Sequence, residues 1–251
     1  MGYVLLNPLR HNLRTDAVVI LVLSALQLTL WVWAVVGITR SANRHTARGG
    51  KLFWANTARV MMCISVIGMA VRVERSLIPQ THLMVSIAAG HDPLDAASVE
   101  VTPDGRTITF DGTFGEAAVD ELQRVMDASP NATTIVLNSD GGRESAAEEL
   151  ARRVRQRHLN TLVEDHCLSA CTFIFLAGNK RELADDAELG FHQATVEGIS
   201  AFGKTLALAQ MAEYYRSQGV RESFIDHIVA TPPESMWYPT EDELKEGRVL
   251  N

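Results

Sequence analysis

The sequence predicts an α/β domain preceded by an N-terminal α-helical transmembrane hairpin. The first 75 residues carry nine Lys/Arg against two acidic residues, a net charge of +7, and they contain two long apolar blocks. The remaining residues carry 14 Lys/Arg and 28 acidic residues, a net charge of −14. In this acidic part short apolar runs alternate with stretches of helical periodicity, which is typical of α/β domains. We therefore expect a membrane anchor over residues 1–75, a linker over 76–98 and a folded domain over 99–251.

The first apolar block runs from Ala17 to Ile38 and has no charged residue over 22 positions. A bilayer core needs about 20 apolar residues, and Trp31 and Trp33 lie near one end, as in the aromatic belts of membrane proteins. A cleaved signal peptide is the alternative, but its apolar core spans only about 7–15 residues and is followed by small residues. The polar residues 39–41 follow here, so we expect a transmembrane helix over about 17–38.

The second apolar block, Leu52 to Val71, contains Asn56 and Arg59. Arg59 is close enough to one end for its side chain to reach the membrane interface. An interfacial amphipathic helix is the alternative, and we favour a second span over about 52–71. Short loops rich in Lys/Arg stay in the cytoplasm, which predicts the inner (plasma) membrane with the C-terminal domain on the extracytoplasmic (periplasmic) side. The basic residues of the loop are Arg40, Arg44, Arg48 and Lys51.

The acidic part begins with a predicted β-hairpin, because β-forming residues alternate over Val99–Phe114 around a Pro-Asp-Gly turn. Helical periodicity or apolar runs then predict helices over 115–129 and 143–158, and strands over 132–139 and 160–165. The apolar run 170–178 fits a buried helix or a buried strand, and residues 182–193 lead into a further strand. Three helices are expected at the end of the chain, over 200–219, 221–231 and 240–247.

Charge and composition exclude some functions. The acidic domain argues against nucleic-acid binding, because phosphate contacts require clustered Lys/Arg. We expect no metal and no cofactor.

Three motifs stand out in the acidic part. They are "NSDGG" at 138–142, Ser169 within "CLSAC" at 167–171, and His192 within "GFHQ" at 190–193, 23 residues after Ser169. Taken singly, each has an ordinary explanation: a turn, a helix N-cap and a packed or surface histidine.

In this order and spacing the motifs resemble those of the Clp protease proteolytic subunit and the wider ClpP/crotonase superfamily, which carries "NSPGG", a small-Ser-small helix start and an "HQ" strand. The segments "LAG" at 176–178 and "WYPTEDELKEGRV" at 237–249 extend the resemblance over Val99–Val249. The two apolar blocks and the cysteine-flanked serine are most similar to predicted periplasmic, membrane-anchored ClpP-like proteins. The resemblance implies a ClpP/crotonase-like stacked ββα superhelix and a homo-oligomer, with the helix over 200–218 in the ring-joining position.

The resemblance also implies roles for individual residues. Ser169 would be the nucleophile and His192 its general base. The backbone N–H groups of Gly141, with Gly142 beside it, and of Ala170 would form an oxyanion hole.

The third member of the expected triad departs from the family pattern, because Ser235 stands in the register of the family's aspartate and Glu234 is adjacent. Three outcomes are open: Glu234 substitutes, a Ser-His pair works without an acid, or the site is weak or inactive. We favour a working Ser-His pair.

Cys167 and Cys171 flank Ser169 and allow three interpretations. We favour two small buried residues; a disulfide is the alternative, which an oxidising compartment would promote. A metal site is disfavoured, because the two cysteines with His166 leave a tetrahedral site incomplete.

The predicted function is a membrane-anchored ClpP-like serine hydrolase, a peptidase acting on peptide or protein substrates. The alternative is a catalytically weak or inactive ClpP-fold module that binds a peptide or protein partner at the membrane. A crotonase-like acyl-CoA enzyme is a third hypothesis, disfavoured because the predicted compartment lacks CoA.

Overall fold

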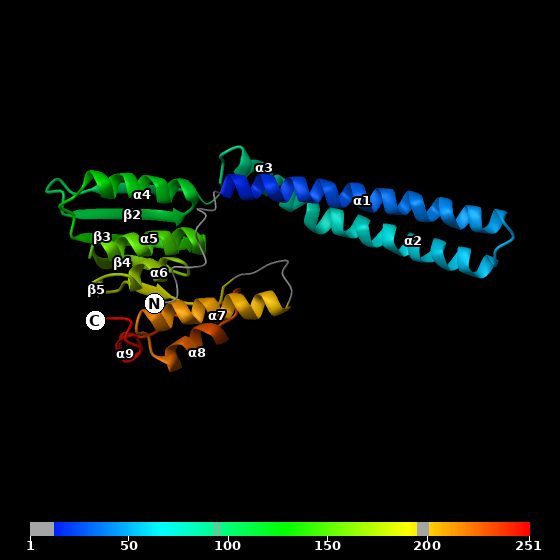
Figure 1. Cartoon of the computed structure of the whole chain (residues 1–251). Helices are drawn as coiled ribbons and strands as arrows, with labels where there is room; N and C mark the ends of the chain where they lie inside the picture. Colours follow the sequence, from blue (N-terminus) through cyan, green and yellow to red (C-terminus); the bar gives the residue numbers. More distant parts are fainter. Residues whose placement is uncertain (1–12, 93, 95, 195–200) are drawn as a thin grey trace. The chain divides into compact units, whose positions relative to one another are not determined.

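The computed structural model describes residues 13–92, 94, 96–194 and 201–251 (Figure 1). The chain divides into two compact units, Met1–Asp92 and Pro93–Asn251. Two sequence predictions lie partly outside the described residues. The expected helix over 200–219 begins at Ser200, and the expected membrane anchor includes residues 1–12.

The first unit is a helical hairpin. It consists of α1 (Leu13–Ala47), α2 (Leu52–Arg72), a π-helical turn (Val73–Leu77) and α3 (Ile78–Ala88). Helix α1 contacts both α2 and α3. Residues Ala17–Ala47 form the one helix, within the described residues, that is long and apolar enough to cross a membrane, with a mean hydropathy of 2.3. A second span by α2 stays a prediction.

Two boundaries in this unit differ from the sequence prediction. Helix α1 continues through the expected loop to Ala47, and the Thr39 and Thr46 hydroxyls donate to carbonyls of the preceding turn. The expected linker over 76–98 is helical as far as Ala88. Pro79 does not end this helix, although it donates no helical hydrogen bond, and the π-helical turn Val73–Leu77 lies directly before it.

Polar side chains connect α1 to α2. The Trp31 indole N–H donates to Ser65 Oγ at 3.1 Å. Arg59 donates to Asn43 Oδ1 at 2.9 Å and to Asn56 Oδ1 at 3.0 Å. Asn56 and Arg59, the two residues that make the second apolar block less hydrophobic, are therefore hydrogen-bond partners.

The second unit is an α/β domain, as predicted. Strands β1 (Ala97–Val101) and β2 (Thr107–Phe114) form the expected antiparallel hairpin. Strands β3 (Thr134–Gly142), β4 (Asn160–Leu168), β5 (Arg181–Leu183) and β6 (Glu188–Gly190) extend the sheet in parallel. The order is β1-β2-β3-β4-β5, and β6 also pairs with β4.

Six helices accompany this sheet in the described part of the domain. They are α4 (Glu116–Ala128), α5 (Glu144–Gln156), α6 (Cys171–Leu176), α7 (Ala201–Ser217), α8 (Glu222–Ala230) and α9 (Glu241–Glu246). The apolar run whose structure the sequence left open is the buried helix α6. The last expected helix, over 240–247, is confirmed as α9, and its N-cap Thr240 forms a capping box with Glu243.

The parallel strands determine where a site can form. Strand β4 pairs with β5 over Thr161–Val163 and with β6 over His166–Leu168. The carboxyl ends of β3, β4 and β6 therefore lie at one edge of the sheet, which is where α/β sheets bind ligands. All three motifs follow or end these strands.

Candidate active site

Ser169 lies in a sharp turn between β4 and α6. We call residues 167–172 the nucleophile turn, because they contain the serine that the sequence predicts as a nucleophile. Its backbone has a φ of 53°, in the left-handed region. A non-glycine residue in this region costs about 1–3 kcal/mol and persists only where the surroundings impose it. A strand–turn–helix with a strained serine is also how hydrolases expose a nucleophilic Oγ. The Ser169 N–H donates to the Gly190 carbonyl at 2.9 Å, which ties the turn to β6.

His192 contacts the Ser169 hydroxyl directly, with 2.7 Å between His192 Nε2 and Ser169 Oγ. The other ring nitrogen, Nδ1, lies 2.7 Å from the Gln193 carbonyl oxygen. A carbonyl only accepts, so Nδ1 carries the proton and Nε2 presents its lone pair to the serine. This tautomer is the one a general base requires.

The structure does not bring Glu234 to His192. Glu234 is exposed and has no hydrogen-bond or ion-pair partner among the described residues. The Gln193 carbonyl takes the place of the third member, and the Gln193 N–H donates to the Thr231 carbonyl at 2.9 Å, at the end of α8. A carbonyl dipole orients the imidazole as a carboxylate would, but it supports the imidazolium less because it carries no net charge.

Sequence reasoning missed Gln193 because its side chain is not involved. Every residue has a carbonyl group, so no sequence signal marks the one that bonds His192.

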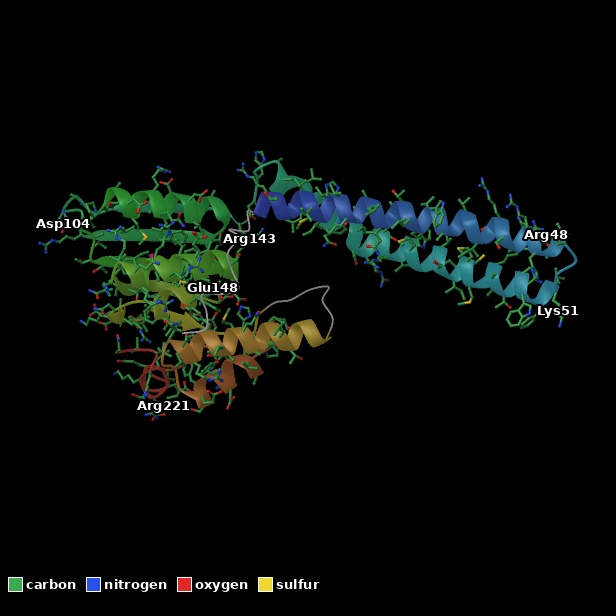
Figure 2. All side chains as sticks on the ribbon, in the orientation of Figure 1. Arg48, Lys51, Asp104, Arg143, Glu148 and Arg221 are labelled. Carbon is green, nitrogen blue, oxygen red and sulfur yellow. A yellow bond between two sulfur atoms is a disulfide. The ribbon has the colours of Figure 1, made fainter. Side chains whose placement is uncertain are left out.

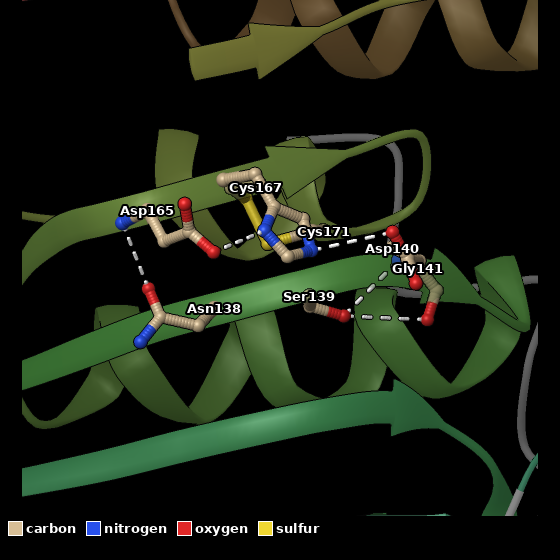
Figure 3. Close-up of polar contacts among 8 residues, drawn as sticks. Asn138, Ser139, Asp140, Gly141, Asp165, Cys167 and Cys171 are labelled. Atoms are coloured by element: carbon tan, nitrogen blue, oxygen red, sulfur yellow. Dashed lines mark hydrogen bonds and ion pairs between the residues drawn. A yellow bond between two sulfur atoms is a disulfide. The ribbon is translucent and has the colours of Figure 1, made fainter. Parts of the chain in front are cut away.

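Gly141 lies against the nucleophile turn. A Cβ atom at this position would lie 2.8 Å from the Leu168 carbonyl oxygen and 3.0 Å from Ser169 Cβ, and the φ of Gly141 is 102°. Only glycine permits this approach. The Gly141 N–H donates to Ser139 Oγ at 3.0 Å, so a buried hydroxyl occupies this expected oxyanion donor (Figure 3).

The two other expected oxyanion donors differ from each other. Gly142 pairs with Phe114 of β2, and a Cβ atom on it would lie 2.5 Å from the Phe114 carbonyl oxygen. Glycine is therefore required at this position by close packing in the sheet. Ala170 is the N-cap of α6, and its N–H has no hydrogen-bond acceptor within the described part of the chain. Gly141 and Ala170 lie together, because the Ala170 nitrogen is 3.1 Å from the Cβ position of Gly141.

Cys167 and Cys171 form a disulfide, with 5.3 Å between their Cα atoms, and both are fully buried (Figure 3). The disulfide, the sequence-based alternative to two unbonded buried cysteines, is therefore present in the structure. The bond closes a ring of five residues with Ser169 at its centre. No group of three or more His, Cys, Asp or Glu side chains in the described residues is placed to hold a metal.

His166 contacts two carboxylates at the same sheet edge. Its Nε2 lies 3.2 Å from Asp140 Oδ1 and its Nδ1 lies 2.9 Å from Asp165 Oδ2, and Figure 3 shows Asp165 and Asp140 in these contacts. The Asp165 N–H also donates to Asn138 Oδ1. These contacts join the ends of β3 and β4 beside the irregularity in their pairing, which lies between Leu137 and Ser139.

A half-buried acidic pair lies on α5, one turn apart. Burial and, to a smaller extent, the negative charge of Glu148 raise the pKa of Glu144 from 4.5 to about 7. Burial also raises the pKa of Glu148. Glu144 is close enough to the buried Tyr215 of α7 to affect its ionisation.

No protein-family model matches the chain, and no curated protein matches it. Among solved structures, the chain is similar to ClpP1 from Listeria monocytogenes, with 17% sequence identity and a TM-score of 0.50. It is also similar to an asparagine-to-aspartate mutant of ClpP1 from Listeria monocytogenes, with 19% identity and a TM-score of 0.50. Each match covers 59% of this chain and 90% of the other. The C-terminal domain therefore has the ClpP-like fold.

The disulfide predicts a specific alkylation pattern. We expect denatured, unreduced protein to take up one alkyl group, on Cys63, which is the free cysteine in the structure, and reduced protein to take up three. Closing a five-residue ring stabilises the fold by about 2 kcal/mol in the chain-entropy model, so reduction should also lower the thermal midpoint. A Cys63→Ala variant is the control. Alkylation of Cys167 or Cys171 without reductant would contradict the assignment.

Glu144 predicts a pH dependence of stability. Its pKa is raised on folding, so the folded state binds more protons than the unfolded state between pH 4.5 and about 7, and stability falls as pH rises through this window. Glu144→Gln removes this loss of stability, because a glutamine side chain does not ionise. We expect the variant to have a higher thermal midpoint than the wild type, by about 2–4 °C for each kcal/mol gained in the free energy of unfolding. The increase should be larger at pH 8 than at pH 5. The exposed Glu164→Gln is the matched control, and an equal shift at both pH values would contradict the prediction.

Proposed function

We propose that this chain is a membrane-anchored serine hydrolase of ClpP-like type, a peptidase that uses a Ser169–His192 pair. The observation that carries the proposal is the 2.7 Å contact between His192 Nε2 and Ser169 Oγ. The pair spans 23 residues of sequence and comes from two different strand ends, and the backbone conformation of Ser169 is strained. Strain that the surroundings impose is concentrated at functional sites.

The reaction follows from the geometry. His192 accepts the proton of the Ser169 hydroxyl as Oγ attacks the carbonyl carbon of a peptide bond. The oxygen of the tetrahedral intermediate carries the negative charge, and the Ala170 N–H, which has no acceptor among the described residues, is a donor for it at the start of α6. His192 then gives the proton to the leaving amine, and water hydrolyses the acyl-enzyme with the same base.

A second candidate function is a non-catalytic module whose site binds a peptide or protein partner. Two observations favour it: the Gly141 N–H is occupied by Ser139 Oγ, and among the described residues His192 Nδ1 bonds the Gln193 carbonyl and no carboxylate. For catalysis, the Ser139 hydroxyl would have to release Gly141 when a substrate binds. If it does not, Ala170 alone serves the oxyanion, and losing one such donor costs about 10²–10³ in kcat.

We further propose that both α1 and α2 cross the inner membrane, with the C-terminal domain on the extracytoplasmic side. Large apolar side chains of α2, including Phe53, Met61 and Ile67, are exposed, and a soluble protein rarely exposes so extended an apolar surface. The hydrogen bonds of Arg59 to Asn43 and Asn56 reduce the cost of placing its polar groups in or near lipid. Arg48 and Lys51 lie at the turn between the helices (Figure 2), which the positive-inside rule assigns to the cytoplasm.

Labelling with a fluorophosphonate tests the catalytic proposal. We expect the full chain in detergent to be labelled at Ser169, Ser169→Ala not to be labelled, and His192→Ala to react about 10²–10⁴-fold more slowly, because the general base is lost. Glu234→Gln should react at the wild-type rate, because Glu234 has no contact with His192. Ser235→Ala is the control for a neighbouring serine. An unlabelled wild-type protein would favour the non-catalytic module.

Alkaline phosphatase fusions test the orientation. The enzyme folds only outside the cytoplasm, so a fusion after residue 90 should be active and a fusion in the turn at residue 50 should be inactive. The opposite result would reverse the orientation, and two active fusions would mean that α2 does not cross.

A further inference from the structure

A buried chain of hydrogen bonds links α7 to the nucleophile turn. The Thr172 hydroxyl donates to the Ser169 carbonyl oxygen at 2.7 Å, and the Tyr215 hydroxyl lies 2.8 Å from Thr172 Oγ1. Thr172 and Tyr215 are 0% and 2% exposed, so no bulk water competes for these bonds. The proton of Thr172 goes to a carbonyl, which only accepts, and the proton between the two hydroxyls therefore belongs to Tyr215. The chain runs from Tyr215 to Thr172 to Ser169.

The carbonyl at the end of this chain shares a peptide group with the Ala170 N–H. A trans peptide is planar, and its C=O and N–H point in opposite directions. The Ser169 carbonyl accepts from the Thr172 hydroxyl and also from the Thr172 N–H at 3.1 Å. Both donors hold this carbonyl on the α6 side, so the Ala170 N–H is held pointing away from them, and it has no acceptor within the described residues.

The φ of 53° at Ser169 describes rotation about the Ser169 N–Cα bond and does not by itself fix the peptide group that follows. The Ser169–Ala170 peptide rotates as a plane through the ψ of Ser169 and the φ of Ala170, and such a rotation would turn the N–H of Ala170 away. The Ser169 N–H is fixed separately by the Gly190 carbonyl. The remaining freedom lies in the Ser169–Ala170 peptide, and the Tyr215–Thr172 chain restrains it.

Tyr215 is built to remain a donor. Its ring packs on Phe173 and Phe191, with ring centroids 5.3 Å and 6.2 Å away. Burial raises the pKa of Tyr215 well above its usual range, and the charge of the nearby Glu144 acts in the same direction. The hydroxyl therefore keeps its proton at neutral pH.

We propose that Tyr215, acting through Thr172, is a positioning residue that holds the Ser169–Ala170 peptide with its N–H directed to the oxyanion of the intermediate. The inference rests on the proposed function, because it assigns a role to the same site. Tyr215 lies on α7, 43 residues after Thr172. The inference therefore makes the position of α7 a determinant of oxyanion stabilisation.

The neighbouring tyrosine provides a matched control. The Tyr214 hydroxyl donates to the Phe173 carbonyl at 2.6 Å, and its ring stacks on Phe173 at 4.4 Å. Tyr214→Phe and Tyr215→Phe each delete one hydroxyl from the same helix and one hydrogen bond to the α6 region, and Tyr214→Phe also removes an interaction with Arg155. Only Tyr215→Phe affects the peptide that carries the Ala170 N–H.

The experiment compares a peptide aldehyde, which forms a tetrahedral adduct with a serine, with the corresponding peptide alcohol, which does not. We expect Tyr215→Phe and Thr172→Val in the full chain to weaken aldehyde binding about 10- to 100-fold, because loss of a complete oxyanion donor costs about 10²–10³ and these variants lose only its orientation. Alcohol binding should stay within about twofold of the wild-type affinity. Thr172→Ser keeps the hydroxyl and should retain most of the aldehyde affinity. Tyr214→Phe should change neither affinity by more than a few-fold.

A second measurement separates this inference from the proposed function. Residue-resolved hydrogen exchange should show faster exchange of the Thr172 N–H, which bonds the Ser169 carbonyl, in Tyr215→Phe than in Tyr214→Phe. If the wild-type protein binds the aldehyde no better than the alcohol, the proposed hydrolase is wrong, and the exchange rates still decide whether Tyr215 holds the peptide. Equal behaviour of the two tyrosine variants in both measurements would overturn the inference.

Discussion

The left-handed backbone of Ser169 is the constraint around which the rest of the site is built. A serine adopts this conformation only when its neighbours are fixed, and three independent attachments fix them here. Strand β6 accepts the Ser169 N–H, the Cys167–Cys171 disulfide closes the turn on itself, and Thr172 holds the Ser169 carbonyl. The first attachment comes from the sheet, the second is a covalent ring within the turn, and the third lies in α6 and is connected through Tyr215 to α7.

The divided pairing of β4 explains why these parts meet. Its first half pairs with β5 and its second half with β6, so the chain can return to the sheet edge and place His192 just beyond β6. Glycine at 141 then lets β3 approach the same turn, because any side chain would collide with the Leu168 carbonyl and Ser169. The Ser-His contact is thus a consequence of strand pairing and one close backbone approach.

In the proposed mechanism the site would stabilise charge mainly through backbone groups. The Gln193 carbonyl bonds His192, the Ala170 N–H has no acceptor among the described residues, and the Gly141 N–H donates to Ser139. Such groups carry no net charge, so the imidazolium of the proposed acyl transfer would be less stabilised than beside an aspartate. A site of this kind suits slow hydrolysis of peptides or recognition of a peptide without turnover. The difference between the two is whether the Ser139 hydroxyl releases the Gly141 N–H when a peptide binds.

Residue types and their spacing determined the long apolar N-terminal helix, the hairpin at Val99–Phe114 and the α/β alternation, and the resemblance of three motifs to ClpP-like proteins gave Ser169 and His192 as candidate partners. These features are local in sequence or depend on two side chains of distinctive chemistry. The tertiary structure alone decided the rest, because the decisive groups are ordinary in sequence. Every residue has a backbone carbonyl, so nothing in the sequence distinguishes that of Gln193. Tyr215 meets Thr172 only when α7 packs on α6. The disulfide, too, depended on the turn bringing two cysteines within bonding distance, which spacing alone left open.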